Sequence, residues 1–111
     1  MHEMSLAEGI LQIVQDQAGN SPRVHSVTLS VGELAGVELD ALRFCFDVVT
    51  RDSAAQDAIL EIETVPGSAF CFDCLAQVPL ARRGNPCPRC EGHSLTVVGG
   101  DQMKVKYLEI D

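Results

Sequence analysis

The chain contains the segment Cys71-Phe72-Asp73-Cys74, and after 12 further residues it contains Cys87-Pro88-Arg89-Cys90. Each C-x-x-C can fold into a tight turn with both sulfur atoms on one side, so two such turns facing each other place four sulfurs at the corners of a tetrahedron. One pair alone indicates little, whereas two pairs at this separation are typical of a four-thiolate metal site. The sequence therefore predicts a small lobe folded around a metal ion that these four cysteines bind.

Two other uses of the four cysteines are open at this point: a pair of disulfides, or a rubredoxin-like iron site for electron transfer. The N-terminus, Met-His-Glu-Met-Ser, has an acidic residue and no long apolar run, so no secretory signal is expected and the chain is expected in the cytoplasm. Reducing conditions there favour metal over disulfides. We expect zinc in a structural role, because four thiolates leave no open position for a substrate.

The overall composition limits the function classes. The chain has 111 residues, of which 46% are hydrophobic, and its 16 acidic and 8 basic residues give a net charge of -8. A nucleic-acid-binding zinc ribbon needs a basic face, so the charge argues against that class. An acidic zinc-ribbon adaptor, such as a transcription or ribosome accessory factor, remains as an alternative. No apolar run is long enough to span a membrane, and no catalytic or phosphate-loop motif is present, so we do not expect an enzyme.

Periodicity predicts two helices outside the lobe. The first is expected over residues 5–18, with Ser5 and Glu8 as a capping box. Its apolar stripe is expected to comprise Leu6, Ile10, Ile13 and Val14, followed by Gln17. The second helix is expected over about residues 38–51, with a stripe of Leu39, Leu42, Cys45, Phe46 and Val49. Cys45, the fifth cysteine, is expected to be buried as a small hydrophobic residue.

Alternating residues predict three long strands, over residues 24–31, 59–65 and 103–110, and a short strand over 95–98 inside the lobe. Val105, Tyr107 and Ile110 of the last strand are expected to face the core. The fold class is therefore α+β: a small three-stranded sheet with two helices, plus an inserted zinc-ribbon-like lobe that carries the four cysteines. The expected domains are residues 1–68 with 101–111, and residues 69–100. The strand order is left open.

A second candidate metal site lies at the start of the chain, in Met1-His2-Glu3. The terminal amine, the backbone nitrogen of His2 and its imidazole can form fused chelate rings around one ion, and such nitrogen-rich sites suit Ni(II) or Cu(II). Glu3 can add a carboxylate or orient the imidazole. The alternative is a disordered terminus that begins Met-His by chance. The other two histidines, His25 and His93, are expected to be a hydrogen-bonded strand residue and a solvated loop residue.

Taken together, these features resemble the HypA/HybF hydrogenase-maturation proteins over the whole chain. The resemblance rests on the N-terminal Met-His-Glu joined to the distal cysteine quartet. It extends to Met4-Ser5-Leu6-Ala7, Val31-Gly32-Glu33-Leu34, Val37-Glu38, Leu42-Arg43-Phe44, Val105-Lys106 and Glu109-Ile110.

The resemblance implies a nickel metallochaperone that carries Ni(II) transiently and, with a HypB-type GTPase, delivers it to the [NiFe]-hydrogenase large-subunit precursor. Members in some organisms also serve urease. Carried over residue by residue, Met1, His2 and Glu3 belong to nickel, and Cys71, Cys74, Cys87 and Cys90 to structural zinc. The domain of residues 1–68 and 101–111 then binds nickel, and that of residues 69–100 binds zinc.

Two further expectations accompany this assignment. Glu38 and Asp40, which lead into the second helix, are the acids expected to assist the nickel site. The lobe and the Gly99-Gly100 hinge permit exchange of a strand or lobe between chains, so a homodimer is an allowed state. No nucleic-acid partner is expected.

Overall fold

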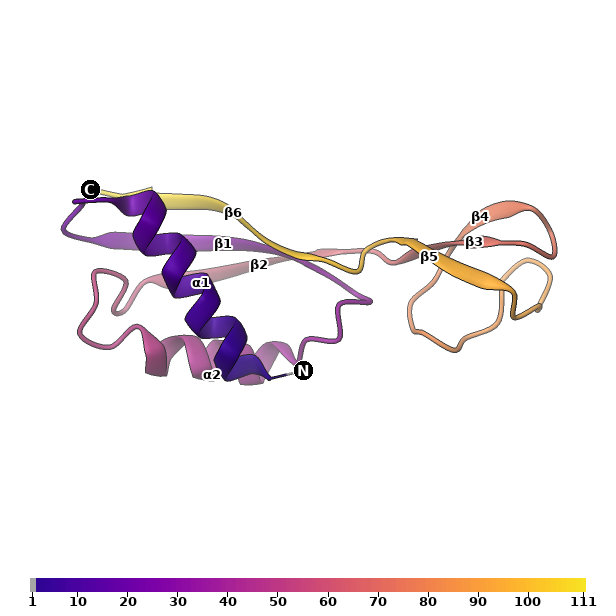
Figure 1. Cartoon of the computed structure of the whole chain (residues 1–111), viewed down its shortest axis with the longest axis horizontal. Helices are drawn as coiled ribbons and strands as arrows, with labels where there is room; N and C mark the ends of the chain where they lie inside the picture. Colours follow the sequence, from indigo (N-terminus) through magenta and orange to yellow (C-terminus); the bar gives the residue numbers. More distant parts are fainter. Residues whose placement is uncertain (1) are drawn as a thin grey trace. The chain divides into compact units, whose positions relative to one another are not determined.

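The computed structural model describes residues 2–111. The order of elements is α1 (Glu3–Ala18), β1 (Val24–Gly32), α2 (Leu39–Val49), β2 (Ile59–Val65), β3 (Ser68–Cys71), β4 (Ala76–Pro79), β5 (Leu95–Gly99) and β6 (Met103–Ile110) (Figure 1). The strands form two three-stranded sheets, ordered β2-β1-β6 and β4-β3-β5. The predicted fold class is therefore confirmed: two helices accompany one sheet, and the cysteine quartet lies in a lobe with a small sheet of its own.

The chain forms two compact units. The first, here called the helical unit, comprises residues 2–29, Val37–Glu63 and Lys104–Asp111; the second, the cysteine unit, comprises Ser30–Gly36 and Thr64–Met103. The cysteine unit thus takes in residues 30–36, which the expected domain of residues 69–100 left out. These residues join the cysteine unit because Leu34 packs into its small core.

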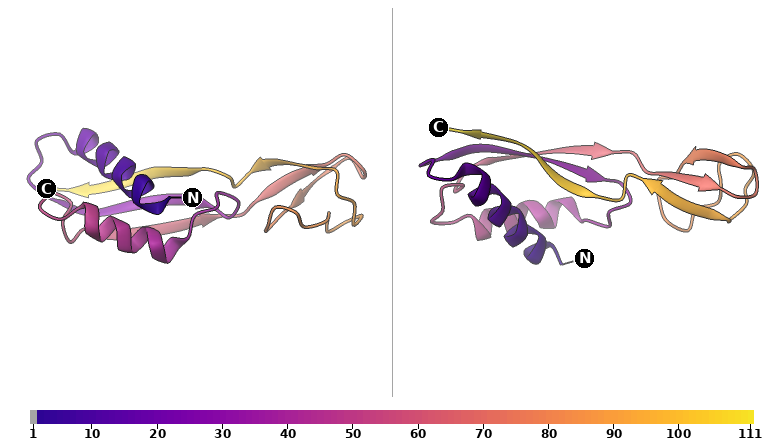
Figure 2. Two further views of the ribbon diagram at one scale, coloured as in Figure 1. Left: turned by 60° about the horizontal axis from the view of Figure 1, so that its bottom comes forward. Right: turned by 45° about the horizontal axis from the view of Figure 1, so that its top comes forward.

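The core of the helical unit lies between its sheet and its two helices, which occupy the same side of the sheet (Figures 1 and 2). The central strand β1 turns Val27 and Leu29 toward the helices, and both are completely buried, as the alternation predicts. The helices contribute buried side chains at helical spacing to the same core: Ile10 and Val14 of α1, and Leu42 and Phe46 of α2. Within residues 2–111, neither helix is long and apolar enough to cross a membrane.

Helix α1 differs from its predicted form at its start and on its buried face. It begins at Glu3, with His2 as the N-cap, so Ser5 lies inside the helix and the predicted Ser5–Glu8 capping box is wrong. The buried residues are Ala7, Ile10, Val14 and Ala18. Ile13, predicted to be in the core, is 46% exposed. The two alanines explain the shift, because small side chains let the helix approach the sheet along that line.

Three other predictions about burial are wrong. Tyr107 and Ile110 on β6 are 59% and 40% exposed, although both were expected to face the core. Cys45 on α2 is only half-buried, because it lies at the edge of the buried stripe rather than within it.

On the opposite side of the sheet, Lys106 of β6 donates to Glu63 of β2 at 2.8 Å. Since β1 lies between these two strands, the ion pair extends over the central strand, where Thr28 is 9% exposed.

The segment that follows β1 holds the base of the cysteine unit together. The backbone N–H of Glu33 donates to Val65 at 2.9 Å, and that of Leu34 donates to Gly100 at 2.8 Å. The Glu33 carboxylate accepts the N–H of Gly67 at 2.9 Å. This short segment thereby hydrogen-bonds to both backbone segments that connect the lobe to the chain: the one that enters it, at Val65 and Gly67, and the one that leaves it, at Gly100.

The backbone segments approach one another so closely here that two positions require glycine. A Cβ atom on Gly32 would collide with the carbonyl oxygen of Gly100, and a Cβ atom on Gly100 would collide with the carbonyl oxygen of Pro66. Gly9, in the middle of α1, is the opposite case, since a Cβ atom there meets nothing within 4 Å.

We predict opposite effects for two Gly→Ala substitutions. Gly32→Ala should destabilise the cysteine unit by about 1–3 kcal/mol, because the added methyl group forces the crossing backbones apart. Gly9→Ala should stabilise α1 by about 0.5–1 kcal/mol, because alanine has the better helix propensity. Amide hydrogen exchange, followed separately in residues 64–103 and in α1, measures both effects. Equal stability of the cysteine unit in Gly32→Ala and in the native protein would contradict the described crossing.

Candidate metal centres

The first cysteine turn is part of a hairpin. Strand β3 pairs antiparallel with β4, and Cys71 lies opposite Ala76, so residues 72–75 form the connecting turn that carries Cys74. Strand β5 pairs with the other edge of β3, with Cys71 opposite Leu95. The first pair of sulfurs is therefore fixed by a three-stranded sheet. The short strand β4 was not predicted from the sequence.

The second cysteine turn is held by backbone hydrogen bonds in place of a sheet. The N–H of Cys87 donates to Gly92 at 2.7 Å, and the N–H of Glu91 donates back to the Cys87 carbonyl at 2.8 Å. Both turns end alike. Leu75 follows Cys74 with φ 55°, and Glu91 follows Cys90 with φ 63°. Each turn thus places a non-glycine residue in the left-handed region, which is sterically unfavourable for an L-amino acid.

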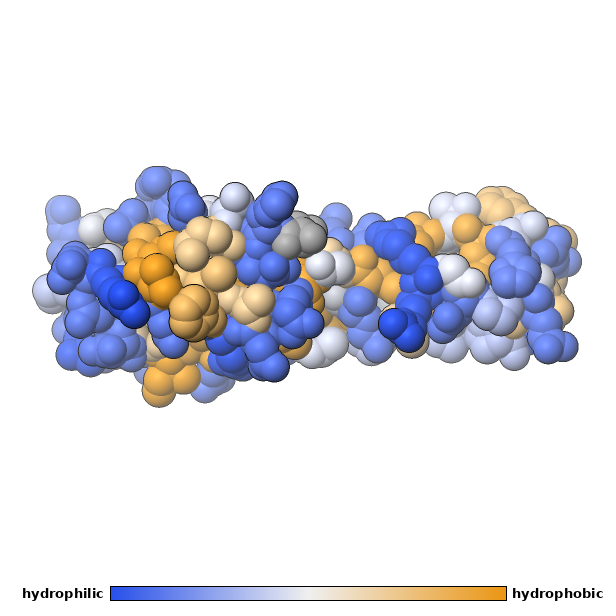
Figure 3. Space-filling model, turned by 90° about the horizontal axis from the view of Figure 1, so that it is seen from below, coloured by the Kyte–Doolittle hydropathy of each residue, from blue (hydrophilic) through white to orange (hydrophobic). Residues whose placement is uncertain are grey.

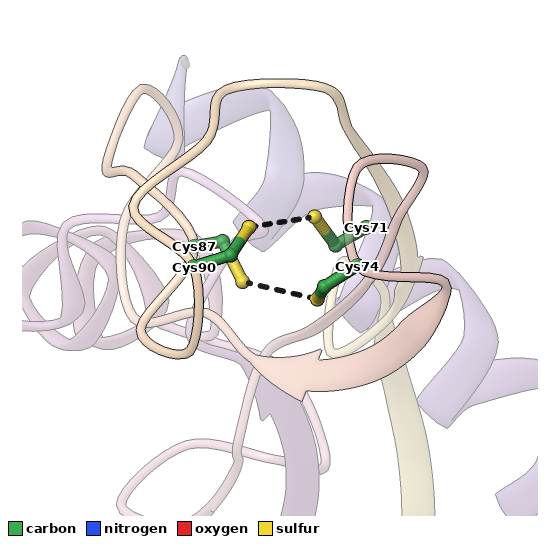
Figure 4. A group of neighbouring side chains, drawn as sticks. All are labelled: Cys71, Cys74, Cys87 and Cys90. Carbon is green, nitrogen blue, oxygen red and sulfur yellow. Dashed lines mark hydrogen bonds between the residues drawn. The ribbon is translucent and has the colours of Figure 1, made fainter.

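The four sulfur atoms face one another (Figure 4). The Cys71 and Cys90 sulfurs lie 3.6 Å apart, and those of Cys74 and Cys87 lie 3.8 Å apart. All four lie within 4.8 Å of one another. A disulfide needs about 2.05 Å between its sulfurs, whereas a regular zinc tetrathiolate with bonds of about 2.3 Å places its sulfurs about 3.8 Å apart. The quartet therefore fits a single tetrahedral ion and does not form disulfides.

The surroundings of the quartet are apolar on one side and open on the other. Cys71 and Cys87 are fully buried and belong to the core of the cysteine unit, while Cys90 is exposed. The remaining buried members of that core are few: Leu34, Ala69, Val78 and Leu80. So small a core stabilises a fold only weakly, and structural metal sites supply the missing free energy in domains of this kind.

The thiols differ in how readily they ionise. Burial raises the pKa of the Cys74 thiol to about 12, and the neighbouring cysteine sulfurs add to the rise. Burial acts in the same direction on Cys87, yet its pKa is lowered to about 7, because the backbone N–H groups of Cys90 and Arg89 stabilise the thiolate. The Arg89 nitrogen lies 3.4 Å from the Cys87 sulfur. A divalent cation stabilises all four thiolates at once, so metal binding releases protons from this site.

The second predicted site, at the N-terminus, is described in part, because Met1 lies outside the described residues. His2 is exposed and is the N-cap of α1, where its carbonyl accepts the N–H of Leu6 at 3.1 Å. An N-cap N–H has no partner within the helix, so a metal can replace its proton without breaking a helical hydrogen bond. The imidazole makes no capping hydrogen bond.

Glu3 links the start of α1 to the start of α2. Its carboxylate accepts the backbone N–H of Glu38, the N-cap of α2, at 3.2 Å. Of the two acids expected to assist nickel, Glu38 therefore contacts Glu3 through its backbone N–H, and Asp40 is an exposed residue in the first turn of α2. A carboxylate held in this way keeps one oxygen free of that hydrogen bond.

The other histidines lie where the sequence predicted. His25 on β1 has its Nε2 2.5 Å from Asp111 Oδ1, and His93 is an exposed loop residue. Within residues 2–111, the cysteine quartet is the one group of side chains able to hold a metal by itself. Sequence reasoning missed the supporting role of Glu33 and Leu34. Their only signal in the sequence was membership in the family resemblance, through Val31-Gly32-Glu33-Leu34.

Comparisons with known proteins agree on one family. The model of the family described as "Hydrogenase/urease nickel incorporation, metallochaperone, hypA" matches residues 1–110. A protein of Albidiferax ferrireducens named hydrogenase maturation factor HypA is 52% identical over 113 aligned positions, and one of the same name from Alkalilimnicola ehrlichii is 54% identical. Both alignments cover 100% of this chain and of the relative.

The fold is similar to two solved structures. The solution structure of the nickel metallochaperone HypA from Helicobacter pylori aligns with a TM-score of 0.70 at 23% sequence identity, covering 99% of this chain and 97% of that chain. A second solution structure of a HypA protein aligns with a TM-score of 0.68 at 23% identity, with coverage of 99% and 96%. At this identity the similarity supports the fold.

The left-handed residue after the first cysteine turn yields a prediction. Leu75 is 74% exposed, so replacing it removes little packing. Leu75→Gly should stabilise the metal-loaded cysteine unit by about 1 kcal/mol, because glycine adopts a positive φ without a Cβ clash. Leu75→Ala is the matched control and should change little. Denaturant titration of the cobalt-substituted protein, followed by its thiolate absorption band, measures the difference. Lower stability of the glycine variant would contradict the assigned backbone.

Proposed function

This chain belongs to the HypA family of nickel-incorporation metallochaperones, and from that premise we propose that it binds Ni(II) at its N-terminus for delivery to a [NiFe]-hydrogenase. Its family is one of maturation factors, so its task is to carry and insert a metal rather than to catalyse a reaction on a substrate. Nickel is the cargo, and it is bound and released in each cycle.

The ligands of the cargo are proposed to be the amine of Met1, the backbone nitrogen and imidazole of His2, and the carboxylate of Glu3. The observation that carries this proposal is the position of His2 at the N-cap of α1, exposed and without a side-chain capping bond. Glu3 follows as the first helical residue, held by Glu38. Nitrogen-rich sites of this composition suit Ni(II), and Asp40 is a further acid at the start of α2.

The resident metal is proposed to be Zn(II), bound by Cys71, Cys74, Cys87 and Cys90. The sulfur separations of 3.6 and 3.8 Å support a tetrahedral zinc tetrathiolate. Zinc in this site supplies folding free energy to the cysteine unit and performs no reaction, because all of its coordination positions are filled. On this assignment, the helical unit is the nickel-binding domain and the cysteine unit is the zinc-binding domain.

The proposed protein partners follow from the proposed delivery of nickel. We propose that a HypB-type GTPase controls release and that the hydrogenase large-subunit precursor receives nickel, all in the cytoplasm. The sequence has no phosphate-binding loop of its own, so a nucleotide-dependent step requires such a partner. The family description names urease beside hydrogenase, which supports urease as a second recipient. A homodimer formed by lobe exchange is compatible with these roles.

A terminal site suits a carrier for a physical reason. Backbone and amine ligands at the end of a chain can be withdrawn from the ion one at a time, without unfolding a core. Protons compete with nickel for the amine and the imidazole, so affinity should fall as the pH falls. Copper binds such ligands more strongly than nickel does, so selectivity comes from coordination geometry, from metal supply and from the partner.

Calorimetric titration of the zinc-loaded protein with Ni(II) tests the nickel site. The protein with its native N-terminus should bind one nickel ion per chain. His2→Ala should lose that binding, because it removes the imidazole. A version with one residue added before Met1 should also lose it, because the added residue moves the amine away from the chelate. His93→Ala is the matched control, since His93 is an exposed histidine of the cysteine unit, and it should bind as the native protein does.

Equal nickel binding by the native protein, His2→Ala and the extended version would refute the terminal site. The chain would then be better interpreted as an acidic zinc-ribbon adaptor.

A further inference from the structure

Helix α2 carries a second apolar stripe that the core does not use. Its first stripe supplies the buried residues Leu42 and Phe46. The second follows the spacing i, i+3, i+4, i+7 and consists of Ala41, Phe44, Cys45 and Val48. Phe44 is 67% exposed, and the other three are half-buried. This face is unusual for a soluble helix, whose solvent side is normally polar.

The helical unit also shows an apolar area in the space-filling view (Figure 3). Figure 3 looks onto the side where α2 lies, and it shows hydrophobic side chains gathered in one patch bordered by hydrophilic ones. An aromatic side chain that is two-thirds exposed, as Phe44 is, is characteristic of a binding surface.

The end of the same helix is acidic. A surface hollow of about 470 Å³ is lined by Asp47, Arg51, Asp52, Gln56 and Asp57. Three carboxylate residues and one arginine line the hollow, and the last turn of α2 has no basic residue. The C-terminal carbonyl groups of the helix add a partial negative charge. The hollow therefore favours a cationic side chain, and it adjoins the apolar stripe because Asp47 lies on α2 beside Phe44 and Val48.

The charge of the whole unit indicates the kind of partner. Within residues 2–29, Val37–Glu63 and Lys104–Asp111 there are twelve acidic and five basic side chains. A second copy of this chain would bring the same carboxylates together at such a surface, and like charges disfavour that contact. A basic partner gains from the same charges.

We propose that the α2 surface, formed by the stripe and the acidic hollow, binds an amphipathic helix of a partner protein whose apolar face is bordered by Lys or Arg. The apolar face covers Phe44 and Val48, and a basic side chain enters the hollow beside Asp47, Asp52 and Asp57. This is the arrangement of a helix bound in a groove, with apolar anchors and charge complementarity at the rim. The surface shares no residue with the proposed nickel ligands, so it stands without them.

The test uses a synthetic helical peptide of about 14 residues, roughly four helical turns, with leucine at i, i+3, i+4 and i+7 and lysine on both flanks. It is titrated into isotope-labelled, zinc-loaded full-length protein, and amide resonances are followed by NMR. The lysine peptide should shift resonances of residues 41–57, and raising the salt concentration should weaken binding, because exposed charges are screened. The same peptide with glutamate in place of lysine should not bind.

Two variants identify the anchor. Phe44→Ala should weaken binding of the lysine peptide at least about tenfold, as expected for an aromatic anchor, and it should fold normally because Phe44 is 67% exposed. Phe72→Ala is the matched control, since Phe72 is an aromatic residue 59% exposed in the cysteine unit, and it should bind like the native protein. Nickel affinity should be unchanged in Phe44→Ala.

Four outcomes would overturn the proposal. They are equal binding of the glutamate peptide, resonance shifts confined to residues outside 41–57, unaltered binding by Phe44→Ala, and self-association of the free protein in sedimentation experiments that Phe44→Ala abolishes. The last outcome would identify a second copy of this chain as the occupant.

Discussion

The convergence of four cysteine sulfurs on one point is the constraint on which the cysteine unit depends. Cys71 and Cys87 are fully buried, and four thiolates this close together repel one another unless a cation lies among them. The apolar core around them is small, so a metal ion bound by the quartet would supply folding free energy that this core lacks. The left-handed residues Leu75 and Glu91 are then explained, because each lets the chain turn away directly after its second cysteine.

The cysteine unit is built from two separate segments of the chain, Ser30–Gly36 and Thr64–Met103, and the shorter segment stabilises the unit. A contiguous insertion would be tied to the protein only through its two ends. Here residues 30–36 belong to the unit, and Glu33 binds it through both its backbone and its carboxylate. The helical unit has a different organisation, with an uncharged core under one sheet face and an acidic exterior. Of the proposed nickel ligands, His2 is the N-cap of α1 and Glu3 is its first residue, so no core residue has to move for the metal to leave them.

Much of this organisation could be predicted from the sequence, and the exceptions have physical causes. Strands of seven or eight residues with clear alternation, such as Ile59–Val65 and Met103–Ile110, were found with their observed bounds. The predicted start of α1 was wrong because Glu3 is held by the backbone of Glu38. That residue is 35 positions away in the sequence, so the contact leaves no local signal. Strand β4 was missed because its four residues are too few to show a period. The quartet itself was predictable from spacing alone.

X-ray absorption spectroscopy of protein carrying one zinc and one nickel ion per chain tests the separation of the two sites most directly, because each metal edge reports its own ligands. We expect four sulfur neighbours around zinc at about 2.3 Å. Around nickel we expect nitrogen and oxygen alone, from an amine, a backbone nitrogen, an imidazole and a carboxylate. Sulfur in the nickel shell, or nitrogen and oxygen in the zinc shell, would contradict two separate sites and would make the cysteine quartet part of the transport site.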